Sequence, residues 1–208
     1  MPDVIEDLRH GNKITILHQI LKIKDVFLDT QTMNRLKNQR CYLAGAIDRV
    51  PDRGDGWRNF ITPILETYGI QVFNPLSKPT NLGMEDAIVV QKKQALKKDG
   101  KYNELSQIMK EIRSVDLRMV DVSDFLIVNL DLNTHPCGTL EEIFWANRQK
   151  KPILIRIEQG KNHAPDWLFG TIPHEFIFNN WDELTTYLNY INNTYTIDHH
   201  KRWCFFNI

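Results

Sequence analysis

Short apolar runs alternate along most of the chain with longer stretches in which apolar residues recur every three or four positions. The short runs predict buried strands, and the periodic stretches predict amphipathic helices. Such an alternation predicts the α/β class: one Rossmann-like or flavodoxin-like domain whose five parallel strands have the order 2-1-3-4-5, with helices on both faces. The predicted strands lie at about 41–45, 70–73, 124–130, 152–156 and 174–178, and the predicted helices at about 57–69, 84–98, 103–121, 139–149 and 181–192.

Three regions do not follow this alternation. Residues 1–39 carry apolar residues at roughly helical spacing, which predicts an N-terminal helical extension before an α/β domain at 40–193. Within that domain, 75–113 is a long polar insertion with two predicted helices, which is typical of a lid or an assembly element. The tail at 194–208 ends in an apolar, aromatic-rich segment, which we expect to pack on its own subunit or on a neighbour.

Composition argues against several classes of protein. The chain has 208 residues, and its 26 Lys and Arg balance its 26 Asp and Glu, so no overall field attracts nucleic acid or an anionic membrane. Lys92, Lys93, Lys97 and Lys98 are interpreted as a solvated helix face, the alternative being a nucleic-acid contact. The apolar runs are far too short to cross a bilayer.

Cysteine usage and the start of the chain indicate the compartment. Three cysteines, Cys41, Cys137 and Cys204, fit free thiols in a reducing environment better than a disulfide framework. The chain starts without the pattern of a signal peptide. We therefore expect a cytoplasmic protein. No zinc-type spacing such as C-x-x-C or H-E-x-x-H is present.

Two segments far apart in the sequence are predicted to meet at one crevice. If the strands at 41–45 and 124–130 are parallel neighbours, the loops that follow them open at the same edge of the sheet. Open α/β sheets bind ligands at that edge, above all where the strand order reverses. We therefore expect a small-molecule site there. The predicted substrate-binding residues are Gly45, Ala46, Asp48, Arg58, Asp131, Gly138 and Thr139.

Glu142 is the leading candidate for chemistry, in the predicted first turn of the helix at 139–149. An ionised carboxylate at a sheet edge can attack an electrophilic sugar carbon and form a covalent intermediate. The segment also fits a capping box, in which the glutamate side chain accepts a hydrogen bond from the N-cap amide. Glu141 is interpreted as the surface residue of the pair. From position alone, Asp116 is typical of a surface carboxylate and Tyr42 of a half-buried strand tyrosine.

Over roughly residues 40–160, the chain resembles the nucleoside 2-deoxyribosyltransferase family and the related deoxynucleotide N-hydrolases. Each motif is short, and their joint order and spacing give the resemblance its specificity. The motifs are Tyr-Leu-Ala-Gly at 42–45, Asp116 upstream of Asp-Phe-Leu-Ile-Val at 124–128, and Gly-Thr-Leu-Glu-Glu at 138–142 followed by Ala146 and Lys-Pro-Ile at 151–153.

This resemblance implies a reaction and a role for each of three catalytic residues. Glu142 matches the nucleophile that takes the deoxyribosyl group, Asp116 matches the acid near the leaving base, and Tyr42 matches the tyrosine that positions nucleophile or sugar. The implied reaction cleaves an N-glycosidic bond with retention, and a second base or water then resolves the intermediate. The resemblance further implies a nucleoside or nucleotide substrate, no metal or organic cofactor, and a homo-oligomer in which a neighbour completes the pocket.

The chain departs from the family pattern at two positions. Phe144 stands where many members have glycine, and Pro136 stands where members carry an aspartate or serine that contacts the 5′ side of the sugar. Nucleoside and nucleotide substrates, and transfer and hydrolysis, therefore stay open. The alternative function is a nucleotide-binding or sensing module on the same fold without turnover.

Overall fold

A computed structural model describes residues 33–194, 201–203 and 206. The chain divides into two compact units, Met1–Asn34 and Arg35–Ile208, and the sheet and its helices belong to the second. The helices predicted within residues 1–32 lie outside the described residues. So do Cys204 and most of the predicted tail.

The second unit is built on a five-stranded parallel sheet of order β2-β1-β3-β4-β5, which confirms the predicted class and strand order. In β3 all six residues are buried, as the continuous apolar run predicts for a central strand covered on both faces. The register places Gly45 opposite Asn129, so β1 and β3 end side by side. The strands are β1 (Arg40–Gly45), β2 (Gln71–Phe73), β3 (Phe125–Leu130), β4 (Ile153–Ile157) and β5 (Ile177–Phe178).

Helices cover both faces of this sheet. Tyr42 and Gly45 lie three positions apart in β1. Successive residues of a strand point to alternate faces, so these two residues point to opposite faces of the sheet. Tyr42 reaches Glu142 on one face, and Gly45 lies against Trp57 on the other. The helices are α2 (Asp55–Thr67), α3 (Ala87–Lys98), α4 (Tyr102–Val122), α5 (Cys137–Arg148), α6 (Asp166–Phe169) and α7 (Trp181–Asn193), with short 3₁₀ turns at Lys161–His163 and His174–Phe176. Thus α5 and α2 lie on opposite faces.

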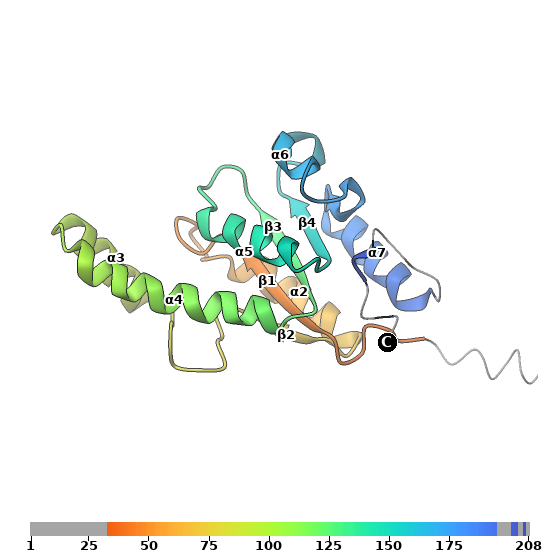
Figure 1. Cartoon of the computed structure of the whole chain (residues 1–208), viewed down its shortest axis with the longest axis horizontal. Helices are drawn as coiled ribbons and strands as arrows, with labels where there is room; N and C mark the ends of the chain where they lie inside the picture. Colours follow the sequence, from red (N-terminus) through yellow and green to blue (C-terminus); the bar gives the residue numbers. More distant parts are fainter. Residues whose placement is uncertain (1–32, 195–200, 204–205, 207–208) are drawn as a thin grey trace, which may run out of the picture. The chain divides into compact units, whose positions relative to one another are not determined.

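The predicted insertion forms a helical hairpin. Figure 1 shows α3 and α4 packed side by side and extending away from the sheet. Helix α3 begins at Ala87, because the Asp86 side chain accepts a hydrogen bond of 2.8 Å from the Val89 amide and caps the helix. One interpretation of its lysines was wrong: Lys92, Lys97 and Lys98 are exposed, but Lys93 is buried and paired with carboxylates.

The described part of the tail packs on its own chain. The Trp203 side chain is buried, its ring centroid lies 5.4 Å from that of Phe125, and its Nε1 donates a 2.9 Å hydrogen bond to the Tyr187 hydroxyl. For Trp203, this agrees with the first of the two predicted locations, packing on its own subunit. Cys41 and Cys137 carry free thiols, as predicted. None of the helices described between residues 33 and 194 has the length and apolar character needed to cross a membrane.

Candidate active site

A hydrogen bond joins two of the predicted catalytic residues. The Tyr42 hydroxyl donates to Oε1 of Glu142 over 2.7 Å. Tyr42 is 1% exposed in the middle of β1, and Glu142 reaches it from α5, which packs against that strand. Burial raises the pKa of Tyr42 well above its usual value, and the negative charge expected on Glu142 raises it further, so the phenol remains a donor.

The structure rules out one of the two interpretations of Glu142, the capping box. Helix α5 begins at Cys137, two residues before its predicted start, and Pro136 at its N-cap makes no side-chain capping bond. The Leu140 amide already donates to the Pro136 carbonyl over 2.8 Å. Glu142 therefore lies in the second turn of the helix, not the first, and the predicted capping box is wrong. The carboxylate is free of that role and turns toward Tyr42 instead.

Glu141 lies on the surface, as predicted. Its carboxylate accepts hydrogen bonds of 2.8 and 2.9 Å from the Arg113 guanidinium of α4, and both side chains are largely exposed. The pKa of Glu141 is lowered by that hydrogen bonding. The two adjacent glutamates thus have opposite environments, one solvated and paired with arginine, the other enclosed.

The Glu142 carboxyl group is enclosed by protein atoms, although the residue as a whole retains some exposed surface. Burial raises its pKa to about 8; the Tyr42 hydrogen bond opposes that rise, and the charge on Asp116 adds to it. A carboxyl group with this pKa titrates near neutral pH, which is a property of acid–base groups in active sites.

Asp116 lies near enough to Glu142 for its charge to raise the pKa of Glu142, which its position in the sequence did not predict. It projects from α4, is 7% exposed, and forms an ion pair of 2.7 Å with the Lys78 ammonium group. Burial raises its pKa to about 6, and the contact with Lys78 opposes that rise. The interpretation of Asp116 as an ordinary surface carboxylate is therefore wrong.

Sequence analysis missed the residues that surround Asp116. Lys78 and Glu85 come from the loop between β2 and α3 and are both buried. With Asp116, Lys93 and Asp48 they form a row of alternating charges, here called the charge chain: Asp116–Lys78–Glu85–Lys93–Asp48. An irregular loop carries no periodic pattern, so no signal in the sequence distinguished these two residues from solvated ones.

Arg58 of α2 is buried completely and does not face solvent in this structure. Its Nη atoms donate to the backbone carbonyls of Gly45 and Gly54 over 3.0 and 3.1 Å. Burial lowers its pKa to about 10, and the charges on Tyr42 and Glu142 oppose that fall. Arg58 thus ties α2 to the end of β1 and places a cation behind the Tyr42–Glu142 pair; a direct contact with substrate stays a prediction.

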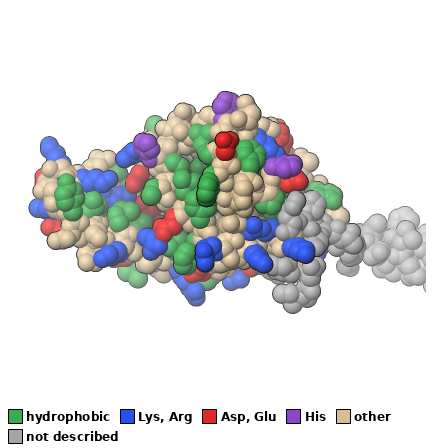
Figure 2. Space-filling view, turned by 45° about the horizontal axis from the view of Figure 1, so that its top comes forward, with side chains coloured by type: hydrophobic (Ala, Val, Ile, Leu, Met, Phe, Trp, Pro, Cys, Tyr) green, Lys and Arg blue, Asp and Glu red, His purple; other side chains and the backbone are tan. Residues whose placement is uncertain are grey.

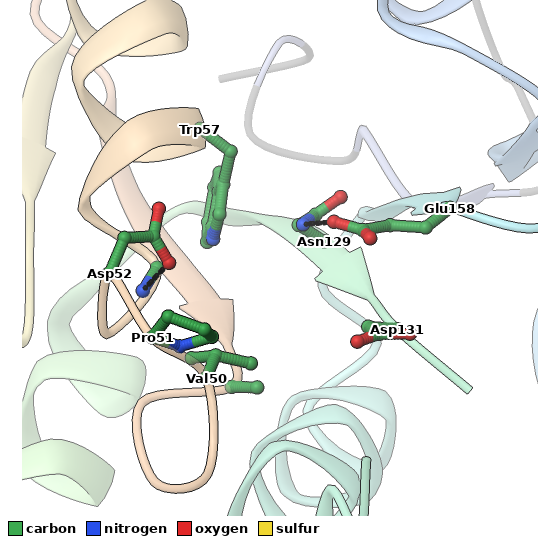
Figure 3. A pocket seen from close by; sticks show the side chains of 9 residues that line it. Val50, Pro51, Asp52, Trp57, Asn129, Asp131 and Glu158 are labelled. Carbon is green, nitrogen blue, oxygen red and sulfur yellow. Dashed lines mark hydrogen bonds between the residues drawn. The ribbon is translucent and has the colours of Figure 1, made fainter. Parts of the chain in front are cut away.

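A cavity of about 270 Å³ opens where the loops after β1 and β3 meet, at the predicted switch point. Figure 3 shows Trp57 and the 50–52 loop on one side of it and Asn129, Asp131 and Glu158 on the other. Ala46 and Asp131 line it, as expected for substrate-binding residues. Tyr42, Asp116 and Glu142 are not among its lining residues, so the open cavity is separate from the three predicted catalytic residues.

The wall residues of this cavity are held by their own contacts. Trp57 stacks on Trp181 of α7 at a centroid distance of 5.8 Å. The Asn129 amide donates a 2.7 Å hydrogen bond to Glu158, and Asp131 accepts one of 2.8 Å from Gln159. Trp57, Asn129 and Glu158 were not predicted: Trp57 and Asn129 lie inside the regular patterns of α2 and β3, and Glu158 lies in the turn after β4.

The remaining predicted residues have different environments. A Cβ added to Gly45 would lie 2.8 Å from Trp57 and 3.0 Å from the Asn129 carbonyl oxygen, so the small size of glycine is required there. Asp48 is exposed and pairs with Lys93 over 3.0 Å. Thr139 is buried in α5, whereas Gly138 is exposed with open space around it.

No group of three or more His, Cys, Asp or Glu residues within the described ranges is arranged to hold a metal ion. On the face shown in Figure 2, acidic and basic side chains are interspersed around a central group of hydrophobic ones. That mixed surface agrees with the balanced composition.

No family model and no curated protein sequence matches the chain. Among solved structures, the chain is similar to a 2-deoxyribosyltransferase from Bacillus psychrosaccharolyticus, with 14% identity, a TM-score of 0.49, and 71% of this chain and 91% of that chain covered. It is also similar to a CMP N-glycosidase from Clostridium botulinum (18% identity, TM-score 0.43, 74% and 99% covered). A third is a 2-deoxyribosyltransferase from Leishmania mexicana (16% identity, TM-score 0.43, 73% and 97% covered). These proteins are enzymes of the kind that the sequence motifs resemble.

Proposed function

We propose that this chain is an enzyme that cleaves the N-glycosidic bond of a nucleoside or nucleotide, through a covalent glycosyl-enzyme on Glu142. The observation that carries the proposal is the 2.7 Å hydrogen bond from the Tyr42 hydroxyl to the Glu142 carboxylate, within the cluster that also holds Asp116. A carboxylate oriented by one strong donor and shielded from water is suited to nucleophilic attack.

The first half of the proposed reaction forms one bond and breaks another. A Glu142 oxygen attacks C1′ of the sugar while the bond from C1′ to the base nitrogen breaks, and the departing base takes a proton from Asp116. In the second half, water or another base attacks C1′ from the side opposite Glu142, gives its proton to the Asp116 carboxylate, and releases the Glu142 carboxylate. Two inversions give overall retention. Water gives hydrolysis and a second base gives transfer.

The pKa values of the two carboxyl groups determine how they share protons. With a pKa of about 6 for Asp116 and about 8 for Glu142, the pair holds one proton between these two pH values. The higher pKa places that proton mainly on Glu142, so the form that the reaction needs, with the proton on Asp116 and the charge on Glu142, is the minor form of the singly protonated pair. The Tyr42 hydrogen bond favours the charge on Glu142, and we expect a bell-shaped rate profile with its maximum between the two values.

One observation favours a second candidate, a nucleotide-binding or sensing module without turnover. The open cavity at the end of β1 and β3 is not lined by Glu142 or Asp116. A ligand could therefore occupy that cavity without meeting the nucleophile.

The test is incubation with deoxynucleosides, ribonucleosides and their 5′-phosphates, with and without a second free base, followed by chromatography of free and exchanged bases. We expect base release by the native chain and by Glu141→Gln, and a loss of several orders of magnitude in Glu142→Gln. Intact mass spectrometry of a rapidly acid-quenched reaction should show one added sugar.

Near-native turnover by Glu142→Gln would remove Glu142 from the nucleophile role. Saturable binding of a nucleotide with no base release from any substrate would support the sensing module instead. Asp116→Asn should lose about 10²–10⁴-fold on bases that need protonation to leave, and much less on bases that leave unprotonated.

A further inference from the structure

The ammonium group of Lys78 is fully enclosed by the protein. Its side chain has 0% exposure, although it comes from an irregular loop between β2 and α3. Lys78 Nζ lies 2.7 Å from Oδ1 of Asp116, 2.5 Å from the Gly83 carbonyl oxygen and 3.7 Å from Oε1 of Glu85. A buried cation with one short ionic contact is oriented by that contact, and it orients its partner in return.

Burying the Lys78 ammonium group removes its charge from water, which is unfavourable unless the contacts inside the protein compensate. Removing a charge from water costs several kcal/mol, and a buried ion pair is weak evidence for stability by itself. Asp116 also has neighbours that oppose its ionisation, because Glu85 in the loop and Glu142 on α5 both bear negative charge when ionised. Lys78 is the one cation in the described part of the chain that contacts the Asp116 carboxyl directly.

We propose that Lys78 is a positioning residue for Asp116: its ion pair fixes the direction of the Asp116 carboxyl group and ties it to the loop that precedes α3. This inference rests on the proposed function for the role of Asp116 as an acid, but not for the contact itself. The titratable and charged groups that act on Asp116 within the described residues include Lys78 and Glu85 from the loop, Arg58 from α2, Glu142 from α5 and Tyr42 from β1.

The charge chain supplies a matched control. Lys93 is also buried, and it pairs with Glu85 over 3.2 Å and with Asp48 over 3.0 Å, but it does not contact Asp116. Lys93→Met and Lys78→Met therefore remove the same chemical group from the same row of charges. Only Lys78→Met removes the contact with the proposed acid.

The primary test measures the titration of Asp116 directly and needs no turnover. Carboxyl ¹³C NMR follows Asp116, assigned by its loss in Asp116→Asn, in the native chain and in both lysine variants. An opposite charge at this distance lowers a carboxyl pKa by about 1–3 pH units, so Lys78→Met should raise the Asp116 midpoint by that amount. Lys93→Met should move it much less. An unchanged midpoint in a folded Lys78→Met protein, or an equal shift in both variants, would overturn the proposal.

The second test uses activity and separates positioning from general stability. If Lys78 acts through Asp116, Lys78→Met lowers kcat about 10- to 100-fold with little change in KM, and it costs nothing further in an Asp116→Asn background. Equal losses in both backgrounds would show that Lys78 acts elsewhere. Lys78→Gln, which keeps a hydrogen-bond donor, replaces Lys78→Met if the latter does not fold.

These two tests also separate this inference from the proposed function. If Lys78→Met shifts the Asp116 titration but the native chain shows no turnover, the Lys78–Asp116 contact is supported and the proposed enzymatic function is contradicted. If the native chain shows turnover but Lys78→Met leaves the Asp116 titration unshifted, the enzymatic function is supported and the positioning role of Lys78 is contradicted.

Discussion

The Tyr42 hydroxyl donates a 2.7 Å hydrogen bond to Oε1 of Glu142, across 100 residues of sequence. The bond joins the central part of β1 to the second turn of α5. Burial alone would hold the Glu142 carboxyl in its neutral form, and the Tyr42 donor, followed by the charge on Arg58, favours the charged form. The contact therefore sets both where the carboxylate points and how readily it ionises.

Tyr42→Phe removes that donor and should shift the rate profile. The hydrogen bond lowers the pKa of Glu142, so its loss should raise that pKa above about 8 and move the alkaline limb upward. Less Glu142 is then ionised at neutral pH, so the maximal rate should fall by about a factor of ten for each unit by which this pKa rises. Rates measured from pH 5 to 10 check this. Tyr68→Phe, which changes a partly buried tyrosine outside the cluster, should leave the profile unchanged.

Glu142→Gln should stabilise the fold at alkaline pH. A carboxyl group in the unfolded chain ionises near pH 4, whereas Glu142 in the folded chain has a pKa of about 8. Between these values the folded state holds more protons, so the free energy of unfolding falls as pH rises. Glutamine carries no proton to lose. Urea unfolding should therefore show the variant more stable than the native chain at pH 9, by a few kcal/mol at most.

Glu141→Gln is the control of opposite sign for this experiment. The pKa of Glu141 is lowered by Arg113, so its ionised form is the stabilised one. Its replacement should slightly destabilise the chain at pH 9 and have less effect as pH falls through its folded pKa. If Glu142→Gln also lost stability at pH 9, the raised pKa of Glu142 would be contradicted.

Gly45→Ala should destabilise the domain through a steric clash. The added Cβ would lie 2.8 Å from Trp57 and 3.0 Å from the Asn129 carbonyl oxygen, and Trp57 is itself held by its stacking on Trp181. Overpacking of this kind costs about 1–3 kcal/mol. Gly138→Ala is the matched control, because an added Cβ there meets nothing within 4 Å and alanine favours a helix. Thermal unfolding of the two variants should give opposite changes in Tm.

We predict self-association of this chain through the α3–α4 hairpin. The described tail residue Trp203 is buried on its own chain, which leaves the hairpin as the stronger candidate. Ile88 is 74% exposed and Tyr102 is 66% exposed on it. Light scattering should show an oligomer that Ile88→Asp weakens. Trp167→Asp, at an aromatic residue of α6 that is 77% exposed, should leave it intact. A native chain that stays monomeric at micromolar concentration would contradict the prediction.

The local pattern of the sequence predicted most of the fold. The apolar run predicted at about 124–130 and the periodic stretch predicted at about 57–69 became β3 and α2, because the strand and helix periods depend only on nearby residues. The strand order followed, since alternating strands and helices form right-handed crossovers with few topologies. The start of α5 was less predictable, because a capping pattern at 139–142 competed with the observed N-cap at Pro136.

The candidate site was predictable only in part. The motifs identified Tyr42, Asp116 and Glu142 as candidate catalytic residues. Only the tertiary structure decided that Glu142 accepts a hydrogen bond from Tyr42 and does not cap its helix. Only the tertiary structure buried Lys78 beside Asp116, because a charge in a loop is solvated or buried according to what distant segments place around it. Periodicity is a local property of the chain, whereas desolvation and ion pairing are set by neighbours that the sequence does not place together.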